Sequence, residues 1–450
     1  MQLNDTIVAI ATAPGPAALA VVRLSGPRAF AVADKMFDGN AKPSAMAGHT
    51  LQHGRIASQR GQAVDEVVLA TYKAPHSFTG EDSVEITCHG GNAAAPAVVE
   101  IAILAGARQA RPGEFTLRAY LNGKLDLAQA EAVADVIGAG TQAAARAALE
   151  RLAGGLSQKI KAVRSGLLDV LAQLEAAVDF PEDDLPQPVV AEMKRTVDAA
   201  RRHVGKLLEG SRTASILRDG ARVVIAGRPN TGKSSLFNLL LREERAIVTE
   251  LPGTTRDVLE GWIDVRGIPV RLFDTAGLRE TTDRIESEGV GRARGKLDQA
   301  DLVLLVIDGS KPPRDEDKTL LDQTRELPRI VVVNKSDLKP AFAPQKGWVK
   351  ASALTGAGLH KLEEAAVAAL TGGKGVDAGS AAAANSRQLE ALQAALRGLE
   401  AAAAGIQRKL SHELVAEDVR AAVDALGAIT GESIGDEVLE RIFSRFCIGK

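Results

Sequence analysis

Cysteine and aromatic residues are both scarce in this sequence. The 450 residues include two cysteines, Cys88 and Cys447, which lie far apart and outside any CxxC pair. This pattern argues against a disulfide framework or a zinc site and fits a reducing compartment. Aromatic side chains make up 3% of the residues. So few rings make a base-stacking RNA reader of the RRM or OB type a poor fit.

An excess of one charge and long apolar runs are lacking as well. Lys and Arg number 55 against 57 Asp and Glu, which leaves a net charge of −2. Any contact with RNA is therefore expected to use a local patch. No apolar run reaches the roughly 18 residues that a membrane span needs, and the N-terminus has no basic signal region. These features predict a soluble cytoplasmic protein.

The pattern of apolar residues changes along the chain. In residues 1–119, short runs rich in Val and Ile are bounded by Gly and Pro, which predicts a small α+β domain. From Leu125, leucines recur every three or four residues, and this predicts helices that resume after Pro186 and continue to about Gly210. Strand-like and helix-like segments then alternate up to residue 371, as in an α/β sheet.

A segment rich in Gly and Ala, 372–384, separates the α/β region from a second leucine stripe that begins at Leu389. We expect the two helical blocks to pack together, so that the α/β unit is an insertion in an all-α domain. The predicted domains are 1–119 (α+β), 120–215 (helical, first part), 216–375 (α/β) and 376–450 (helical, second part).

The α/β region contains a phosphate-binding loop. Residues 227–234 read GRPNTGKS, which matches GxxxxGK[ST] between an apolar strand and a helix. Backbone N–H groups of such a loop surround phosphate oxygens. Lys233 is expected to reach the β and γ phosphates, and Ser234 to ligate Mg²⁺.

Three shorter motifs follow in the order expected of a GTPase. Asp274 opens the sequence DTAG at the end of a strand, where a carboxylate can hold Mg²⁺ through water. Asn334 opens NKSD, whose last residue, Asp337, can accept hydrogen bonds from the ring N–H and amino group of guanine. Ser352 begins SAL, a loop placed to support the guanine edge. The sequence therefore predicts a GTP-specific P-loop domain.

The hydrolytic machinery departs from that of signalling GTPases. Leu278 stands after DTAG, where those proteins usually carry a glutamine that orients the attacking water. Another group must orient the water, and the carboxylates that follow are the possible ones, although each is also a typical solvated charge. They are Glu280, Asp283, Glu286 and Glu288. In the segment GTTRD, Thr255 is the expected Mg²⁺ ligand, and Arg256 is either an arginine finger or an ion-pair partner.

Taken together, the chain resembles the tRNA-modification GTPase family MnmE, also called TrmE, over its whole length. The resemblance is carried by the GTPase motifs and by four further segments. These are APG at 13–15, VRLSG at 22–26, RPGEFT at 111–116 with NGK at 122–124, and FCIGK at 446–450. The resemblance implies a GTP-hydrolysing subunit of a complex that adds aminomethyl or carboxymethylaminomethyl groups at C5 of the tRNA wobble uridine.

The family resemblance also implies cofactors, partners and site residues. It implies GTP, Mg²⁺, K⁺ and a folate of the 5-formyltetrahydrofolate type, and a homodimer that joins an FAD-containing flavoprotein, MnmG, in a heterotetramer acting on tRNA. Folate would be bound by Arg23, Glu81, Lys124 and Lys450, and K⁺ by Asn230, Thr249, Leu251 and Thr254. Glu286 becomes the catalytic carboxylate. GTP is expected to contact Asn230, Thr231, Gly232, Lys233, Ser234, Ser235, Thr249, Thr254, Thr255, Asp274, Thr275, Ala276, Gly277, Asn334, Lys335, Asp337, Ser352 and Ala353.

A second interpretation is an Era-like GTPase switch acting in ribosome assembly, because such proteins share these nucleotide motifs. That class usually joins its GTPase domain to a KH module, and no GxxG with basic flanks is present here. The sequence does not show which surface contacts RNA. Arg146, Arg151, Lys159, Lys161 and Arg164 lie along the predicted long helix, but Glu150 interrupts them and a solvated helix face explains them better.

Overall fold

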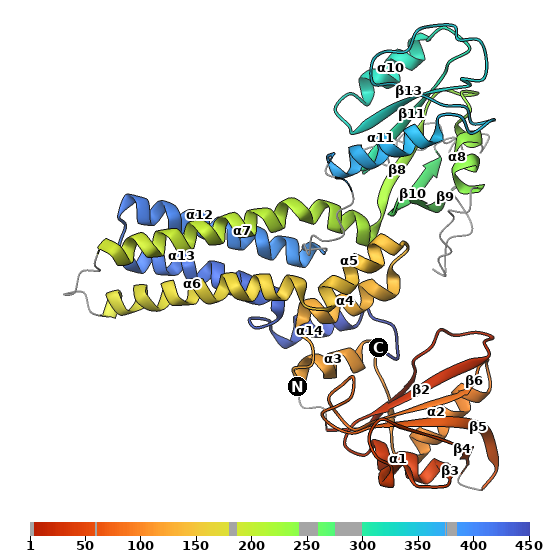
Figure 1. Cartoon of the computed structure of the whole chain (residues 1–450), viewed down its shortest axis with the longest axis vertical. Helices are drawn as coiled ribbons and strands as arrows, with labels where there is room; N and C mark the ends of the chain where they lie inside the picture. The colour runs from red at the N-terminus through yellow and green to blue at the C-terminus, as the bar shows by residue number, and fades with distance from the viewer. Residues whose placement is uncertain are drawn as a thin grey trace, which may run out of the picture. The chain divides into compact units, whose positions relative to one another are not determined.

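The computed structural model describes residues 4–58, 61–179, 187–242, 260–274, 299–373, 375 and 385–450 (Figure 1). The chain divides into two units. One consists of Met1–Ala134 with Gly427–Lys450, and the other of Asp135–Leu426. The C-terminal 24 residues therefore belong with the N-terminal part of the chain rather than with the preceding helices. Each unit is described by itself below.

The first unit is built on a seven-stranded sheet with the strand order β3-β4-β5-β6-β2-β1-β7. Its strands are β1 (Ile7–Ile10), β2 (Leu19–Ser25), β3 (Phe37–Gly39), β4 (Thr50–Ala57), β5 (Ala63–Tyr72), β6 (Ser83–His89) and β7 (Arg108–Gln109). Its helices are α1 (Ala29–Met36), α2 (Ala94–Ala105), α3 (Glu114–Leu121) and α14 (Asp436–Phe443), with a short 3₁₀ turn at Pro43–Ala45. Helices α4 (Leu127–Gly138) and α13 (His412–Thr430) each continue from one unit into the other.

The two faces of this sheet carry different residues because side chains alternate along each strand. In β2, Ala20, Val22 and Leu24 are buried in the core formed with α1 and α2. Arg23 and Ser25 lie on the opposite face, where Ala9 and Ile7 of β1 are their direct cross-strand neighbours. Ile7 and Ala9 pack there with Phe115 of α3. This second face of the sheet carries Arg23, one of the four residues predicted to bind folate.

The second unit contains helices and a P-loop sheet with the order β13-β12-β11-β8-β10-β9. The strands are β8 (Ala221–Ala226), β9 (Glu260–Val265), β10 (Ile268–Asp274), β11 (Leu302–Asp308), β12 (Arg329–Asn334) and β13 (Val349–Lys350). The helices of the sheet region are α8 (Lys233–Arg242), α10 (Asp315–Gln323) and α11 (Leu359–Thr371). Each neighbouring pair of strands is parallel except β9 with β10, so β8, β10, β11, β12 and β13 end at the same edge of the sheet.

The remaining helices are α5 (Gln142–Leu152), α6 (Gly155–Asp179), α7 (Gln187–Asp219) and α12 (Ser386–Arg408). Two of them begin at polar caps, because the side chains of Thr141 and Asn385 accept from backbone N–H groups in the first turns of α5 and α12. Helix α12 packs along α7, as expected for two helical blocks of one domain. The predicted end of the helix near Gly210 was wrong, since α7 continues to Asp219.

These elements confirm the predicted fold class, a P-loop α/β domain inserted in an all-α domain and preceded by an α+β domain. None of the helices in the described ranges is long and apolar enough to cross a bilayer.

Candidate functional site

The nucleotide motifs converge at the edge of the sheet where the parallel strands end. The P-loop follows β8, Asp274 ends β10, Asn334 ends β12, and Ser352 follows β13. Asn334 joins two of these segments, because its Nδ2 donates to the carbonyl of Thr231 at 2.8 Å and its Oδ1 accepts from Ala353 N at 2.9 Å. One amide side chain therefore fixes the base-recognition loops to the phosphate loop.

The phosphate-binding loop has the shape that its sequence predicts. Asn230 has φ of 63°, in the left-handed region that Asn tolerates better than most residues. Lys233 is buried, and its Nζ donates to the carbonyl of Arg228 at 2.9 Å. Ser234 Oγ donates to Asp274 Oδ2 at 2.8 Å. This hydroxyl–carboxylate pair consists of oxygen donors, the ligand type that Mg²⁺ prefers.

The guanine-recognition residues are arranged by short contacts. Ser352 Oγ donates to Asp337 Oδ1 at 2.5 Å, which orients the carboxylate. Lys335 Nζ donates to the carbonyl of Asn230 at 2.9 Å and to Asp308 Oδ2 at 2.7 Å. Burial alone would raise the pKa of Asp308, but hydrogen bonds from Lys335 and Ser310 outweigh it and hold the pKa below its usual value. The ionised Asp308 thus keeps Lys335 against the P-loop.

Two positioning contacts at this site were missed in the sequence. Asp308 is the last residue of β11, whose residues are all buried, and this position at a strand end is the signal that could have identified it. Arg228, inside the P-loop, donates from Nε to both carboxylate oxygens of Asp317 at 2.8 Å, and both side chains are buried. This ion pair fastens the P-loop to the first turn of α10. The two residues are 89 positions apart, so the sequence held no sign of their contact.

The structure places about half of the predicted nucleotide and metal residues. Those at this edge of the sheet are Asn230, Thr231, Gly232, Lys233, Ser234, Ser235, Asp274, Asn334, Lys335, Asp337, Ser352 and Ala353. Outside the described residues lie Thr249, Leu251, Thr254, Thr255, Thr275, Ala276, Gly277 and Glu286. In the part of the chain that the structure describes, no cluster of three His, Cys, Asp or Glu side chains could hold a metal.

The four residues predicted to bind folate surround helix α3. Arg23 lies over the rings of Phe78 and Phe115, with its Cζ 5.3 and 5.7 Å from their centroids, and it pairs with Glu85 at 2.7 Å. Glu81 accepts from Ser25 Oγ at 2.7 Å and from Arg118 Nη1 of α3 at 3.1 Å. Arg23 and Glu81 therefore form ion pairs with different residues, Glu85 and Arg118.

The other two residues lie at either end of α3. Lys124 follows α3, and its Nζ donates to the carbonyl of Pro75 at 3.1 Å. The main-chain oxygen of Lys450 accepts from Phe115 N at 3.2 Å, and that of Cys447 accepts from Gly113 N at 3.3 Å. The main-chain oxygens of Cys447 and Lys450 thus accept hydrogen bonds at the start of α3, where backbone N–H groups have no partner within the helix.

A buried charge network underlies this region. Arg118 has a fully buried side chain and contacts Asp5 Oδ1 at 2.6 Å, Glu114 Oε1 at 3.1 Å and Glu81. Arg108 contacts Asp5 and Glu114, each at 2.6 Å. The hydrogen bond from Arg108, together with that from Arg118, lowers the pKa of Asp5 to about 2 despite partial burial. The network joins the segment before β1, strand β7, helix α3 and the loop of Glu81.

We expect the contribution of Asp5 to be lost in acid. Its pKa is lower in the folded protein than the ordinary value of about 3.9, so the stabilisation is complete above that value and disappears as the pH falls from about 4 to about 2. Because the Asp5 side chain is 46% exposed, the contribution is below about 1 kcal/mol. Hydrogen exchange of the β1 amides should be faster in Asp5→Asn than in wild type at pH 7, and the difference should shrink through this pH window. An unchanged difference at pH 2.5 would contradict this assignment.

Comparison with known proteins gives the family. The TrmE N-terminal domain family matches residues 6–124, and the MnmE helical domain family matches residues 127–447. The tRNA modification GTPase MnmE of Symbiobacterium thermophilum is 46% identical over 99% of this chain and 100% of its own length. This chain belongs to the MnmE family.

Other relatives agree with the assignment. The tRNA modification GTPase MnmE of Chloroflexus aurantiacus is 45% identical, and the match covers both chains completely. Among solved structures, the G domain of the T. maritima FeoB iron transporter is 28% identical over 33% of this chain and 98% of its own, with a TM-score of 0.25. As a member of the MnmE family, the chain is a GTPase involved in tRNA modification.

Proposed function

We propose that this protein is the GTP-hydrolysing subunit of a complex that adds aminomethyl or carboxymethylaminomethyl groups at C5 of the tRNA wobble uridine. The proposal includes a one-carbon folate in the first unit, an FAD-containing flavoprotein partner, a homodimer and a cytoplasmic location. The observation that supports it is that one chain carries both a guanine-nucleotide edge in its second unit and a cluster of charged residues around α3 in its first unit.

The residues of the nucleotide edge have separate roles in this proposal. Lys233 would bind the β and γ phosphates, Asp337 the guanine, and Ser234 with Asp274 the magnesium ion, which supplies positive charge to the phosphates. Asn334 and Lys335 hold the base-binding and phosphate-binding segments together through their contacts with Thr231 and Asn230. Thr255 and Glu286 complete the proposal as the second magnesium ligand and the catalytic carboxylate.

The residues around α3 suit a folate ligand. Glu81 could accept from the amino and ring N–H groups of a pterin, and the cations Arg23, Lys124 and Lys450 could meet the glutamate tail. The aromatic rings beside Arg23 add flat apolar surface for the pterin.

The test of the overall function is nucleoside analysis of tRNA from a strain that lacks this gene. The wobble-uridine modification is expected to disappear and to return when the gene is restored. A full level of modified uridine in the deletion strain would overturn the proposal.

Removing the last four residues, Cys447–Lys450, is expected to abolish folate binding and to leave GTP affinity unchanged. The reason is that this tail holds the first turn of α3 through the contacts of Cys447 and Lys450 with Gly113 and Phe115. Calorimetric titration with 5-formyltetrahydrofolate and with a GTP analogue measures both affinities. Lys450→Ala separates the two roles of this residue, because it keeps the main-chain contacts and removes the charged side chain that would meet the glutamate tail. Equal folate affinity in the truncated and intact chains would refute the role of the tail.

A further inference from the structure

Helix α7 exposes a row of positively charged side chains that the nucleotide and folate sites do not use. We call it the α7 basic stripe; it consists of Lys194, Arg195, Arg201, Arg202, Lys206 and Arg212, all exposed. Residues 194–212 contain six Lys or Arg and two acidic residues, Asp198 and Glu209, whereas the whole chain has a net charge of −2. The stripe is thus a local concentration of positive charge in a nearly neutral protein.

The geometry of the helix separates this stripe from the core. The buried positions of α7 in this stretch include Met193, Val197 and Val204, and α7 packs against α6 and α12 in the helical bundle (Figure 1). At 100° per residue, Arg195, Arg202 and Lys206 fall on the side away from these buried positions, and Lys194, Arg201 and Arg212 fall on its flank. From Lys194 to Arg212 the stripe runs about 27 Å along the helix, at 1.5 Å per residue.

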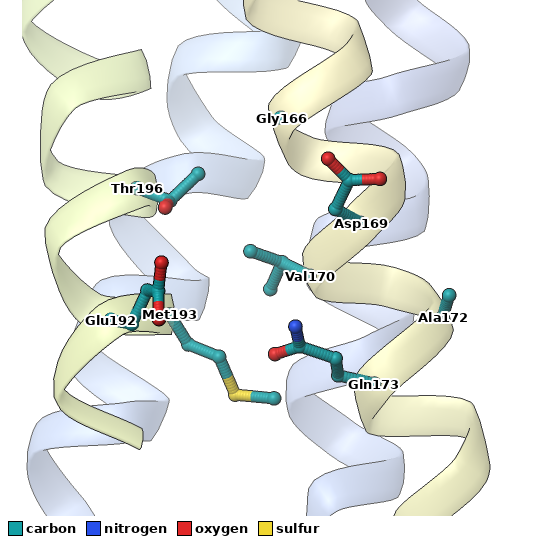
Figure 2. A pocket seen from close by; sticks show the side chains of 8 residues that line it. All are labelled: Gly166, Asp169, Val170, Ala172, Gln173, Glu192, Met193 and Thr196. Atoms are coloured by element: carbon teal, nitrogen blue, oxygen red, sulfur yellow. The ribbon is translucent and has the colours of Figure 1, made fainter. Parts of the chain in front are cut away.

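Acidic groups leave most of the stripe uncompensated. Asp198 pairs with Arg201 at 3.4 Å, and no other carboxylate is recorded in an ion pair with the six cations among the residues that the structure describes. Glu192 of α7 and Asp169 of α6 instead line a pocket of about 380 Å³ between these two helices (Figure 2). Glu192 therefore faces α6, whereas six cations outnumber the two carboxylates, Asp198 and Glu209, on the side of α7 that carries the stripe.

We infer that the α7 basic stripe binds the phosphate backbone of the tRNA substrate. The inference rests on the proposed function, which requires the chain to meet a tRNA while its overall charge provides no attraction. Lys and Arg side chains placed along a rigid helix neutralise successive phosphates and release the condensed counterions, which gives affinity without reading the sequence. The stripe holds the tRNA, and the modified base is positioned elsewhere.

An anionic membrane is a poorer fit to this surface. Interfacial helices insert apolar side chains beside their charges. The exposed large apolar residues of the described chain include none on α7, whose apolar side is buried in the bundle. An acidic protein surface is the remaining alternative, and the experiment separates it from RNA.

The test compares two triple charge reversals in the full-length chain. The stripe variant is Arg201→Glu, Arg202→Glu and Lys206→Glu. The matched control is Arg325→Glu, Lys346→Glu and Lys361→Glu, three exposed residues of the P-loop domain that change the net charge equally. Binding of a tRNA with a wobble uridine is measured by fluorescence anisotropy from 50 to 300 mM potassium chloride, and GTP hydrolysis reports that each variant is folded.

The stripe variant is expected to bind tRNA at least about tenfold more weakly at ~100 mM salt, with the slope of log K against log salt reduced by about 2 to 3. The control should keep the affinity and slope of the wild type. A folded stripe variant with the tRNA affinity and salt slope of the wild type would overturn the inference. A stripe variant that binds tRNA normally but no longer binds the flavoprotein would overturn it as well. If the wild-type chain, alone and with its flavoprotein, failed to bind tRNA at all, the proposed function would fail first.

Discussion

GTP turnover is expected to be about 10³-fold faster in potassium than in sodium at equal ionic strength. A P-loop GTPase without an added positive charge at the transferring phosphate is slow, at about 10⁻⁴ s⁻¹, and a well-placed cation is worth roughly 10³ or more. Leu278 stands where signalling GTPases carry the water-orienting glutamine. Hydrolysis of GTP by this chain therefore depends more heavily on other groups. A potassium ion between the β and γ phosphates would supply the charge that an arginine finger supplies elsewhere.

Variants of Asn230 test whether its side-chain oxygen holds the ion. Asn230→Ala should remove the difference between potassium and sodium, but alanine is also strained at a φ of 63°. Asn230→Gly is the matched control, since glycine adopts this conformation freely and lacks the oxygen. Loss of the potassium effect in both variants, with GTP still bound, assigns the effect to the oxygen. A wild-type protein that hydrolyses GTP equally fast in sodium would refute the cation assignment.

The carboxylate of Glu286 has a separate test in the same assay. Glu286→Ala should lower turnover while GTP affinity and the preference for potassium over sodium remain, because a water-orienting group acts on the attacking water and not on the bound nucleotide. Normal turnover in this variant would show that another group orients the water.

The nucleotide site could be predicted from the sequence because each of its parts is a short contiguous motif at a strand end. The P-loop, NKSD and SAL segments and Asp274 each predict one contact, and parallel strands bring them to one edge. Arg228 and Asp308 were missed because their partners, Asp317 and Lys335, come from other segments. Pairing across 89 or 27 residues depends on the folded sheet and leaves no local pattern.

The α+β unit shows the same limit at the level of secondary structure. Strands β1, β2, β5 and β6 contain the runs rich in Val and Ile from which the sequence predicts an α+β domain. Strand β4, TLQHGRIA, was missed because polar residues and a glycine dilute its apolar alternation, and pairing with β5 along its length stabilises it instead. Helix α1 was missed because its eight residues are too few for a clear period.

Replacing Arg118 by methionine is expected to destabilise the first unit by about 3 kcal/mol and to abolish folate binding. Removing one partner of a buried ion pair costs about 3–5 kcal/mol, since the other charge stays desolvated. The lower value applies here because Arg108 still pairs with Asp5 and Glu114. Among the described residues, Arg118 is the only cation in an ion pair with Glu81. Without Arg118, the hydrogen bond from Ser25 alone would orient the Glu81 carboxylate. The loss should therefore fall most heavily on the carboxylate proposed to bind the pterin.

A double-mutant cycle separates this positioning role from general destabilisation. Arg118→Lys keeps the charge but loses the forked contacts with Asp5 and Glu81, so it should fold and still bind folate more weakly, by about tenfold or more. If Arg118 acts through Glu81, adding Glu81→Gln to Arg118→Lys should weaken folate binding little beyond Glu81→Gln alone. Arg55→Met is the matched control, because Arg55 forms an exposed pair with Glu66, both side chains being 59% exposed. Fully additive losses of folate affinity in a folded Arg118→Lys protein would show that Arg118 does not position Glu81.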